Sequence, residues 1–227
     1  MEIDIFSSIR DDMQTEFFIQ CLRSGELLAG RRKDEMVSIS TSLAKYLHEN
    51  NIQNIVLLDR AARPTYVGLT EAWRMLYPDE RRPGIWFVNP DIARDRLGPA
   101  EAAKELKETY PRLMKMRDSP VMVFDLCSHT EDGSLFSASR MFQEAGFKDI
   151  RTGLAQPPEI EYNSSTAVAN HDFVALPHIA EAFCYPFGKD VMTKKGHSVK
   201  PERNEFGKHV AYARELRAEI RKAFRHA

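Results

Sequence analysis

The most constraining feature of the sequence is the regular alternation of short apolar runs with longer amphipathic segments. The runs are NIVLL, GIWFV, VMVF and DIRTGLA, at residues 54–58, 84–88, 121–124 and 149–155. Short runs rich in β-branched and aromatic residues are typical of strands that are buried on both faces of a sheet. The segments between them carry apolar side chains at helical spacing. This alternation predicts an α/β fold, a mostly parallel sheet flanked by helices.

The same patterns divide the chain into three parts. Residues 1–50 are predicted as an N-terminal helical segment packed on the core, residues 51–155 as the core itself, and residues 156–227 as a cap region and a C-terminal helix. Residues 159–200 look irregular and would form a small cap over the edge of the sheet. Individual helices are expected at residues 9–23, 34–49, 65–77, 99–116, 135–145 and 203–225.

Composition excludes several classes of function. The chain is 43% hydrophobic and 29% charged, with a net charge of −1, which fits a soluble globular protein and gives no global attraction to nucleic acid or to an anionic membrane. No apolar run is long enough to cross a bilayer, and the N-terminus lacks the order of a signal peptide. Three widely spaced cysteines fit a reducing compartment. We therefore expect a cytoplasmic protein with no nucleic-acid or membrane partner.

Two strand-to-helix turns carry the chemistry that stands out. Right-handed crossovers bring such turns to one edge of a parallel sheet, where ligands bind. In the second turn, DLCSHTEDGS (125–134), Asp125 ends a strand and could accept hydrogen bonds from a sugar or hold a divalent cation. The turn also offers hydroxyl groups, a glycine and the start of a helix, which together would cradle a phosphate monoester. The predicted phosphate-binding residues are Ser128, His129, Thr130, Gly133 and Ser134.

The first turn, DRAARP (59–64), combines two arginines with small residues. Arg60 and Arg63 flank Ala61-Ala62. Guanidinium groups beside a close backbone approach suit a diphosphate. Pro64 is well placed in the first turn of the following helix. Surface ion pairs are the alternative role for both arginines, and a helix or turn cap is the alternative role for Asp125.

The pair of turns resembles the type I phosphoribosyltransferases. The segment VMVFDLCSHTEDGSLFSASRMFQEAGFKDIRTGLA is similar to the family's strand, acidic and hydroxyl-rich turn, and helix ending near Ala-Gly. The earlier segment IVLLDRAARPTYVGL is similar to the family's pyrophosphate loop, with Ala61-Ala62 in the place of two glycines. The resemblance covers roughly residues 50–155. It implies a Rossmann-like parallel sheet that binds phosphoribosyl pyrophosphate with Mg²⁺.

The resemblance also implies a reaction and its residues. A nitrogenous base would displace pyrophosphate at the anomeric carbon of the ribose. Arg60, Ala61, Ala62 and Arg63 would bind the pyrophosphate, and Asp125 would hold the ribose hydroxyls or Mg²⁺. The general base would be Glu131, Asp132 or His129. A lid would come from PDERRPG or from NPDIARDRLGP, with Arg81, Arg82, Arg94 and Arg96 closing over the diphosphate.

Three alternatives remain open at this point. The family has two adjacent acids where this chain has only Asp125, which favours a non-catalytic protein that binds a nucleotide or phosphosugar and regulates. The order VFDL followed by DGSL is partly similar to haloacid dehalogenase-type phosphatases, although Cys127 occupies the place of their second aspartate. The C-terminal helix, with Leu216 and Ile220 in its apolar stripe, could form a homodimer, but packing on its own core is the preferred interpretation.

Overall fold

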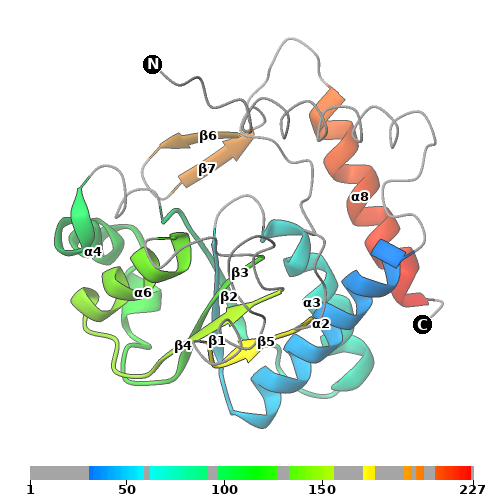
Figure 1. The fold of residues 1–227 in the computed structure, drawn as a ribbon, viewed down its shortest axis with the longest axis horizontal. Coiled ribbons are helices and arrows are strands. Elements are labelled where there is room, and N and C mark those ends of the chain that lie inside the picture. The colour runs from blue at the N-terminus through cyan, green and yellow to red at the C-terminus, as the bar shows by residue number, and fades with distance from the viewer. Residues whose placement is uncertain are drawn as a thin grey trace, which may run out of the picture.

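A five-stranded sheet forms the centre of the computed structural model (Figure 1), which describes residues 31–58, 62–90, 97–126, 133–155, 171–176, 192–195, 198–201 and 208–225. The strand order is β2-β1-β3-β4-β5, and all neighbouring strands are parallel. The strands are β1 (Asn54–Leu58), β2 (Gly84–Val88), β3 (Val121–Asp125), β4 (Ile150–Leu154) and β5 (Phe173–Val174). The predicted α/β class, and the four strands predicted from apolar runs, are confirmed.

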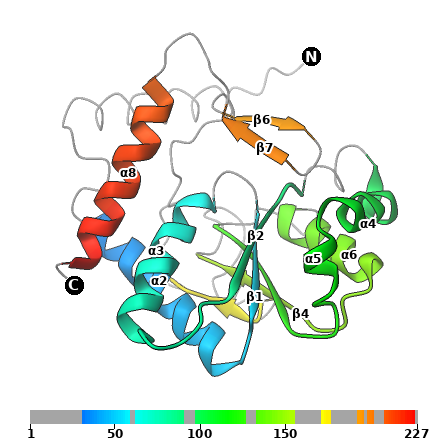
Figure 2. The ribbon, with the colours of Figure 1, turned by 180° about the vertical axis from the view of Figure 1, so that it is seen from behind.

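Helices cover both faces of this sheet (Figures 1 and 2). One face carries α2 (Arg31–Glu49), α3 (Arg63–Leu76) and α8 (Lys208–Arg225). The other carries α4 (Gly98–Thr109), α5 (Pro111–Met114) and α6 (Ser134–Ala145). Side chains alternate along a strand. Accordingly, β1 contributes Ile55 and Leu57 to the first cluster and Val56 and Leu58 to the second.

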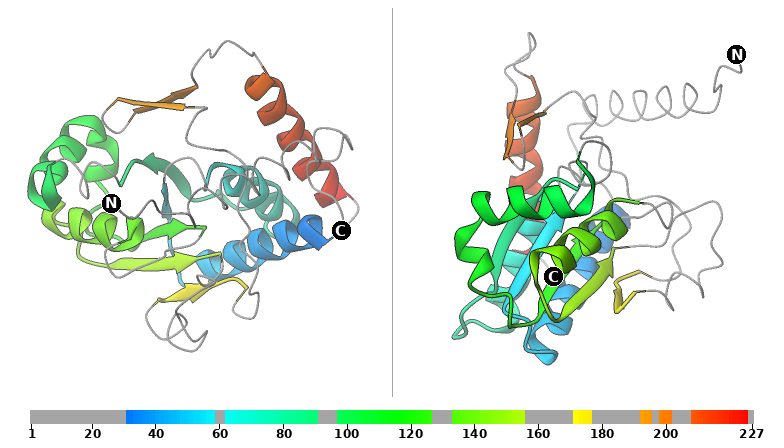
Figure 3. Two further views of the ribbon diagram at one scale, coloured as in Figure 1. Left: turned by 45° about the horizontal axis from the view of Figure 1, so that its top comes forward. Right: turned by 90° about the vertical axis from the view of Figure 1, so that its left-hand side faces the viewer.

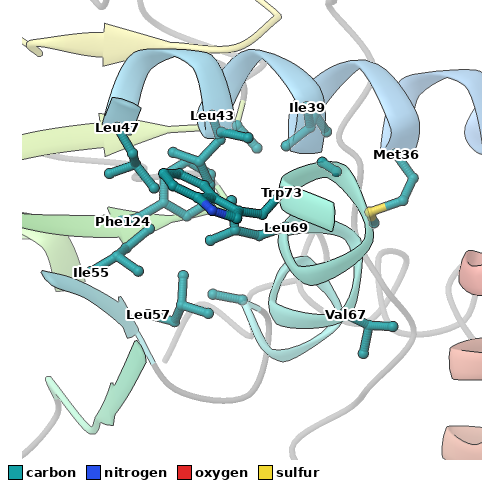
Figure 4. Close-up of a cluster of buried hydrophobic side chains, with 14 of the residues drawn as sticks. Met36, Ile39, Leu43, Leu47, Ile55, Leu57, Val67, Leu69, Trp73 and Phe124 are labelled. Atoms are coloured by element: carbon teal, nitrogen blue, oxygen red, sulfur yellow. The ribbon is translucent and has the colours of Figure 1, made fainter. Parts of the chain in front are cut away.

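The cluster under α2, α3 and α8 shows why the helical spacing was informative. Ile39, Leu43 and Leu47 of α2 are fully buried against Leu69 and Trp73 of α3 (Figure 4). On α8, Leu216 is 2% exposed and Ile220 is fully buried in the same cluster. The prediction that the C-terminal stripe packs on the chain's own core is therefore confirmed for these two residues.

The single helix predicted over residues 99–116 is wrong in its length. Helix α4 ends at Thr109, and α5 begins after Tyr110, at Pro111. Proline has no N–H to donate, and it disfavours helical backbone in the residue before it. Tyr110 accordingly has φ −124° and ψ 59°, and its hydroxyl donates to the Phe87 carbonyl of β2 at 2.5 Å.

The region predicted as irregular, residues 159–200, contains strands where it is described. Residues Phe173 and Val174 extend the sheet as β5, drawn yellow in Figure 3 beside β4. Strand β6 (Met192–Lys195) pairs antiparallel with β7 (Ser198–Pro201). This hairpin lies beyond the carboxyl ends of the sheet strands in Figures 1 and 2. In the part of the chain that the structure describes, no helix combines the length and the apolar character needed to cross a membrane.

Candidate functional site

The chain reverses direction across the sheet between β1 and β3. From β1 it runs through α3 on one face to β2, and from β2 it returns through α4 and α5 on the other face to β3. In open parallel sheets, such a switch point opens a crevice at the carboxyl ends of the two strands. The two turns singled out in the sequence follow these two strands.

Asp125 ends β3 and is 7% exposed. Its Oδ1 accepts a hydrogen bond from the Leu126 backbone N–H at 2.8 Å, and its Oδ2 accepts a short hydrogen bond from the Ser134 hydroxyl. A buried carboxylate needs such donors, because desolvation without them is costly. The β3 end and the α6 start are thereby tied together through two side chains.

The start of α6 has ordinary backbone geometry. Gly133, the residue before the helix, has φ −68° and ψ 176°, an extended conformation that does not require glycine. Its carbonyl accepts from the Ser137 N–H at 3.0 Å. The first N–H groups of a helix have no intrahelical acceptor and carry the positive end of the helix dipole. The Ser134 hydroxyl has one proton, which it donates to Asp125, so a phosphate here would meet backbone N–H groups first.

The described part of the first turn begins at Ala62, which is fully buried. Ala62 has φ −80° and ψ −5°, a right-handed conformation that alanine adopts without strain. Pro64 lies in the first turn of α3, as predicted. At Ala62, therefore, alanine adopts the backbone of this turn without strain. The side chain of Arg63 is outside the described part of the structure.

Two buried polar residues at this edge were not predicted. Thr65, in the first turn of α3, is fully buried, and its hydroxyl has no hydrogen-bond partner within the described part of the chain. Thr41 and Thr70, by contrast, donate to carbonyls four residues earlier at 2.8 Å. For Thr65 that carbonyl would belong to residue 61, which precedes the helix. Asn89 directly follows β2 and is 2% exposed. The position of Asn89 directly after an apolar run could have predicted a polar side chain at the carboxyl end of a strand.

The first of the two predicted lids has its backbone at the amino end of β2. Arg81 and Arg82 directly precede β2 and so lie at its amino end. A five-residue strand spans about 16 Å, so their backbone lies about that far from the candidate turns, but the Arg82 side chain runs along α3 toward its first turn. Arg82 is also held on α3, where its guanidinium donates to the Thr70 hydroxyl and lies 5.4 Å from the centre of the Tyr66 ring.

The remaining predicted site residues fall outside the described part of the structure. They are Arg60, Ala61, Arg94, Arg96, Ser128, His129, Thr130, Glu131 and Asp132. Among the residues that are described, no group of three or more histidine, cysteine, aspartate or glutamate side chains could hold a metal ion. Asp125 is one carboxylate. Mg²⁺ is often bound by one or two carboxylates together with substrate phosphates, and one such contribution is the role open to Asp125.

Comparisons with protein-family models and with curated proteins give no match to this chain. A function for this chain is therefore inferred from its own residues and from their placement at the switch point.

Proposed function

We propose that the chain binds phosphoribosyl pyrophosphate between the carboxyl ends of β1 and β3, and transfers its phosphoribosyl group to a nitrogenous base. The observation that carries this proposal is the placement of the two turns. They follow neighbouring strands, on the two sides of the switch point where open α/β sheets bind ligands. The resemblance of both turns to the phosphoribosyltransferase loops supports the choice of ligand.

Each part of the ligand has a proposed partner. The 5-phosphate would meet the backbone N–H groups at the start of α6, a twelve-residue helix. The pyrophosphate would lie over the start of α3 and the arginine-containing turn before it. Asp125, held by Leu126 and Ser134, would face the ribose or contribute one ligand to Mg²⁺ carried by the pyrophosphate. In that role Mg²⁺ would neutralise charge on the departing pyrophosphate.

A non-catalytic binding role is the second candidate, and one observation favours it. Both oxygens of Asp125 already accept hydrogen bonds within the protein. A carboxylate used in this way supports the architecture of the site and has less capacity for a metal or a substrate. The chain would then bind a nucleotide or phosphosugar without transferring a phosphoribosyl group. The phosphatase alternative stays a prediction that no described contact favours.

Calorimetric titration with phosphoribosyl pyrophosphate and Mg²⁺ tests the binding step. Wild type should bind, and Ser134→Arg should bind at least tenfold more weakly, because its side chain would occupy the start of α6. Ser139→Arg is the matched control, since Ser139 lies in the same helix and donates to the Leu135 carbonyl. Thermal melts should establish that both variants fold. No binding by wild type, or equal binding by all three proteins, would refute the proposal.

Pyrophosphate release separates the two candidate functions. Wild-type protein, phosphoribosyl pyrophosphate and Mg²⁺ are incubated with individual purine and pyrimidine bases. Release that depends on one base supports transfer. Saturable binding with no release for any base supports the regulatory role instead.

A further inference from the structure

A cavity of about 710 Å³ lies at the opposite, amino-terminal edge of the sheet, where β1 and β2 begin. Its lining comes from the end of α2, the end of α3, the segment before β2, and the region of α5. Cavities of roughly 300–1,000 Å³ are typical of small-molecule sites.

Asn54 provides an unused hydrogen-bond donor in the lining. Its side-chain Oδ1 accepts from the Trp86 indole N–H at 3.1 Å. The indole nitrogen is only a donor, so this contact fixes which way the amide points. Among the described residues the amide nitrogen then has no partner, although Asn54 is only 3% exposed. Buried donors without acceptors are uncommon in folded proteins. This nitrogen has almost no accessible surface, so a ligand oxygen would supply the missing acceptor after a small shift of the side chains around it.

The charged side chains of the lining favour an anion. Arg81, Arg82 and Arg112 line the cavity together with one acid, Glu80. Both carboxylate oxygens of Glu80 lie 3.1 Å from His48 Nε2. Arg82 is held on α3 as described above. Arg81 and Arg112 are exposed, and their guanidinium groups have the geometry that binds phosphate oxygens in pairs.

Aromatic side chains supply another part of the cavity wall. Trp86 is partly buried, and Trp73 is 5% exposed, and both line the cavity. The indole N–H of Trp73 donates to the Glu80 carbonyl at 3.3 Å, so this wall is fixed in place. Fixed aromatic faces bind planar rings.

We propose that this cavity binds a nucleoside monophosphate. Its phosphate dianion would contact Arg81 and Arg112, an acceptor atom would take the Asn54 amide proton, and its base would lie against Trp86. This site is separate from the carboxyl-edge site, because the length of β1 lies between them. It stands whether or not the chain transfers a phosphoribosyl group.

Calorimetric titration with adenosine monophosphate tests the site, using Arg112→Ala against Arg117→Ala. Both arginines are exposed and lie on the same segment between α4 and β3, but only Arg112 lines the cavity. Arg112→Ala should weaken binding at least tenfold, and Arg117→Ala by less than twofold. Asn54→Asp, which keeps an acceptor for Trp86 but adds negative charge, should abolish binding while thermal melts show a folded protein.

Further titrations distinguish this cavity from the site at the carboxyl edge. Ser134→Arg should bind adenosine monophosphate as wild type does. Loss of binding in Ser134→Arg together with normal binding in Arg112→Ala would overturn the inference, because the nucleotide would then occupy the carboxyl edge. Equal weakening in Arg112→Ala and Arg117→Ala would overturn it as well, as would no binding by wild type. Inorganic phosphate that binds as tightly as the nucleotide would refute the role given to the base.

Discussion

At the scale of single residues, the contact between Ser134 and Asp125 offers a direct test of how the carboxyl edge is built. Ser134→Ala removes the hydroxyl that donates to Asp125 Oδ2 and leaves a carboxylate that is 7% exposed with one donor fewer. Loss of a partner to a buried charged group costs about 1–3 kcal/mol. We expect the free energy of unfolding, measured by urea denaturation at pH 7, to fall by that amount.

Ser139→Ala is the control for this substitution. Ser139→Ala also removes one serine hydroxyl from α6, but the Ser139 hydroxyl donates at 2.8 Å to the Leu135 carbonyl. That carbonyl belongs to the helix, so we expect a change of about 0.5 kcal/mol or less. Equal effects of the two substitutions would show that the Ser134 contact adds nothing specific to stability.

At the scale of elements, the end of α6 depends on one backbone conformation. Gly146 follows the helix with φ 95°, and a Cβ built there would meet no atom within 4 Å. Gly146→Ala should therefore destabilise the protein by about 1 kcal/mol through backbone strain alone. Gly146→Asn should cost less, since asparagine tolerates this region and Asn51 already adopts φ 52° in this chain. Urea denaturation measures both, and a larger loss for Asn than for Ala would contradict the explanation.

The same glycine shows why much of the fold could be predicted from the sequence. Local sequence patterns were enough to predict α6, because its apolar stripe at helical spacing ends at Gly146. The short apolar runs were likewise enough to predict β1, β2 and β3. Sequence patterns did not predict elements that were too short, and they gave the wrong helix length where a proline interrupted the helical spacing of apolar residues. Strand β5 has only two residues, too few for any periodicity. Pro111 divides a segment whose side chains alone suggested one helix.

The candidate site was less predictable than the fold. Sequence order placed Asp125 at a strand end and Pro64 at a helix start, and both placements are confirmed. The pairing of Asp125 with Ser134 depends on the angle at which α6 leaves the sheet, which no sequence pattern gives. The isolated Thr65 hydroxyl likewise depends on where α3 begins, because a start one turn earlier would offer it a helical carbonyl.

At the scale of the whole molecule, α8 joins the end of the chain to the core formed by α2 and α3. Leu216→Ala should lower the free energy of unfolding by about 2–5 kcal/mol, because Leu216 is 2% exposed within that core. Arg217→Ala, an exposed neighbour on the same helix, should change it by about 0.5 kcal/mol or less. The unfolding midpoint should not vary with protein concentration. A midpoint that rises with concentration would indicate that the stripe also joins two copies of the chain.

The pH dependence of stability provides a second whole-molecule test, through His171 beside β5. Burial lowers the pKa of His171 below its usual value near 6.5, and the carboxylate of Asp172 opposes this effect. The unfolded chain therefore takes up this proton at a higher pH than the folded protein does. Because the unfolded state binds more protons in that range, the contribution of His171 to stability is complete above pH 6.5 and falls as the pH is lowered below it.

His171→Gln isolates this contribution, because glutamine does not titrate and can still hydrogen-bond to Thr152, whose hydroxyl lies 3.3 Å from His171 Nδ1. We expect the loss of stability between pH 7.5 and pH 5.5, measured by urea denaturation, to be smaller in the variant than in wild type. The rest of the chain is the same in both proteins, so its contributions cancel in the comparison. A steeper loss in the variant would mean that the folded state favours the charged imidazole of His171, through Asp172, more than burial disfavours it.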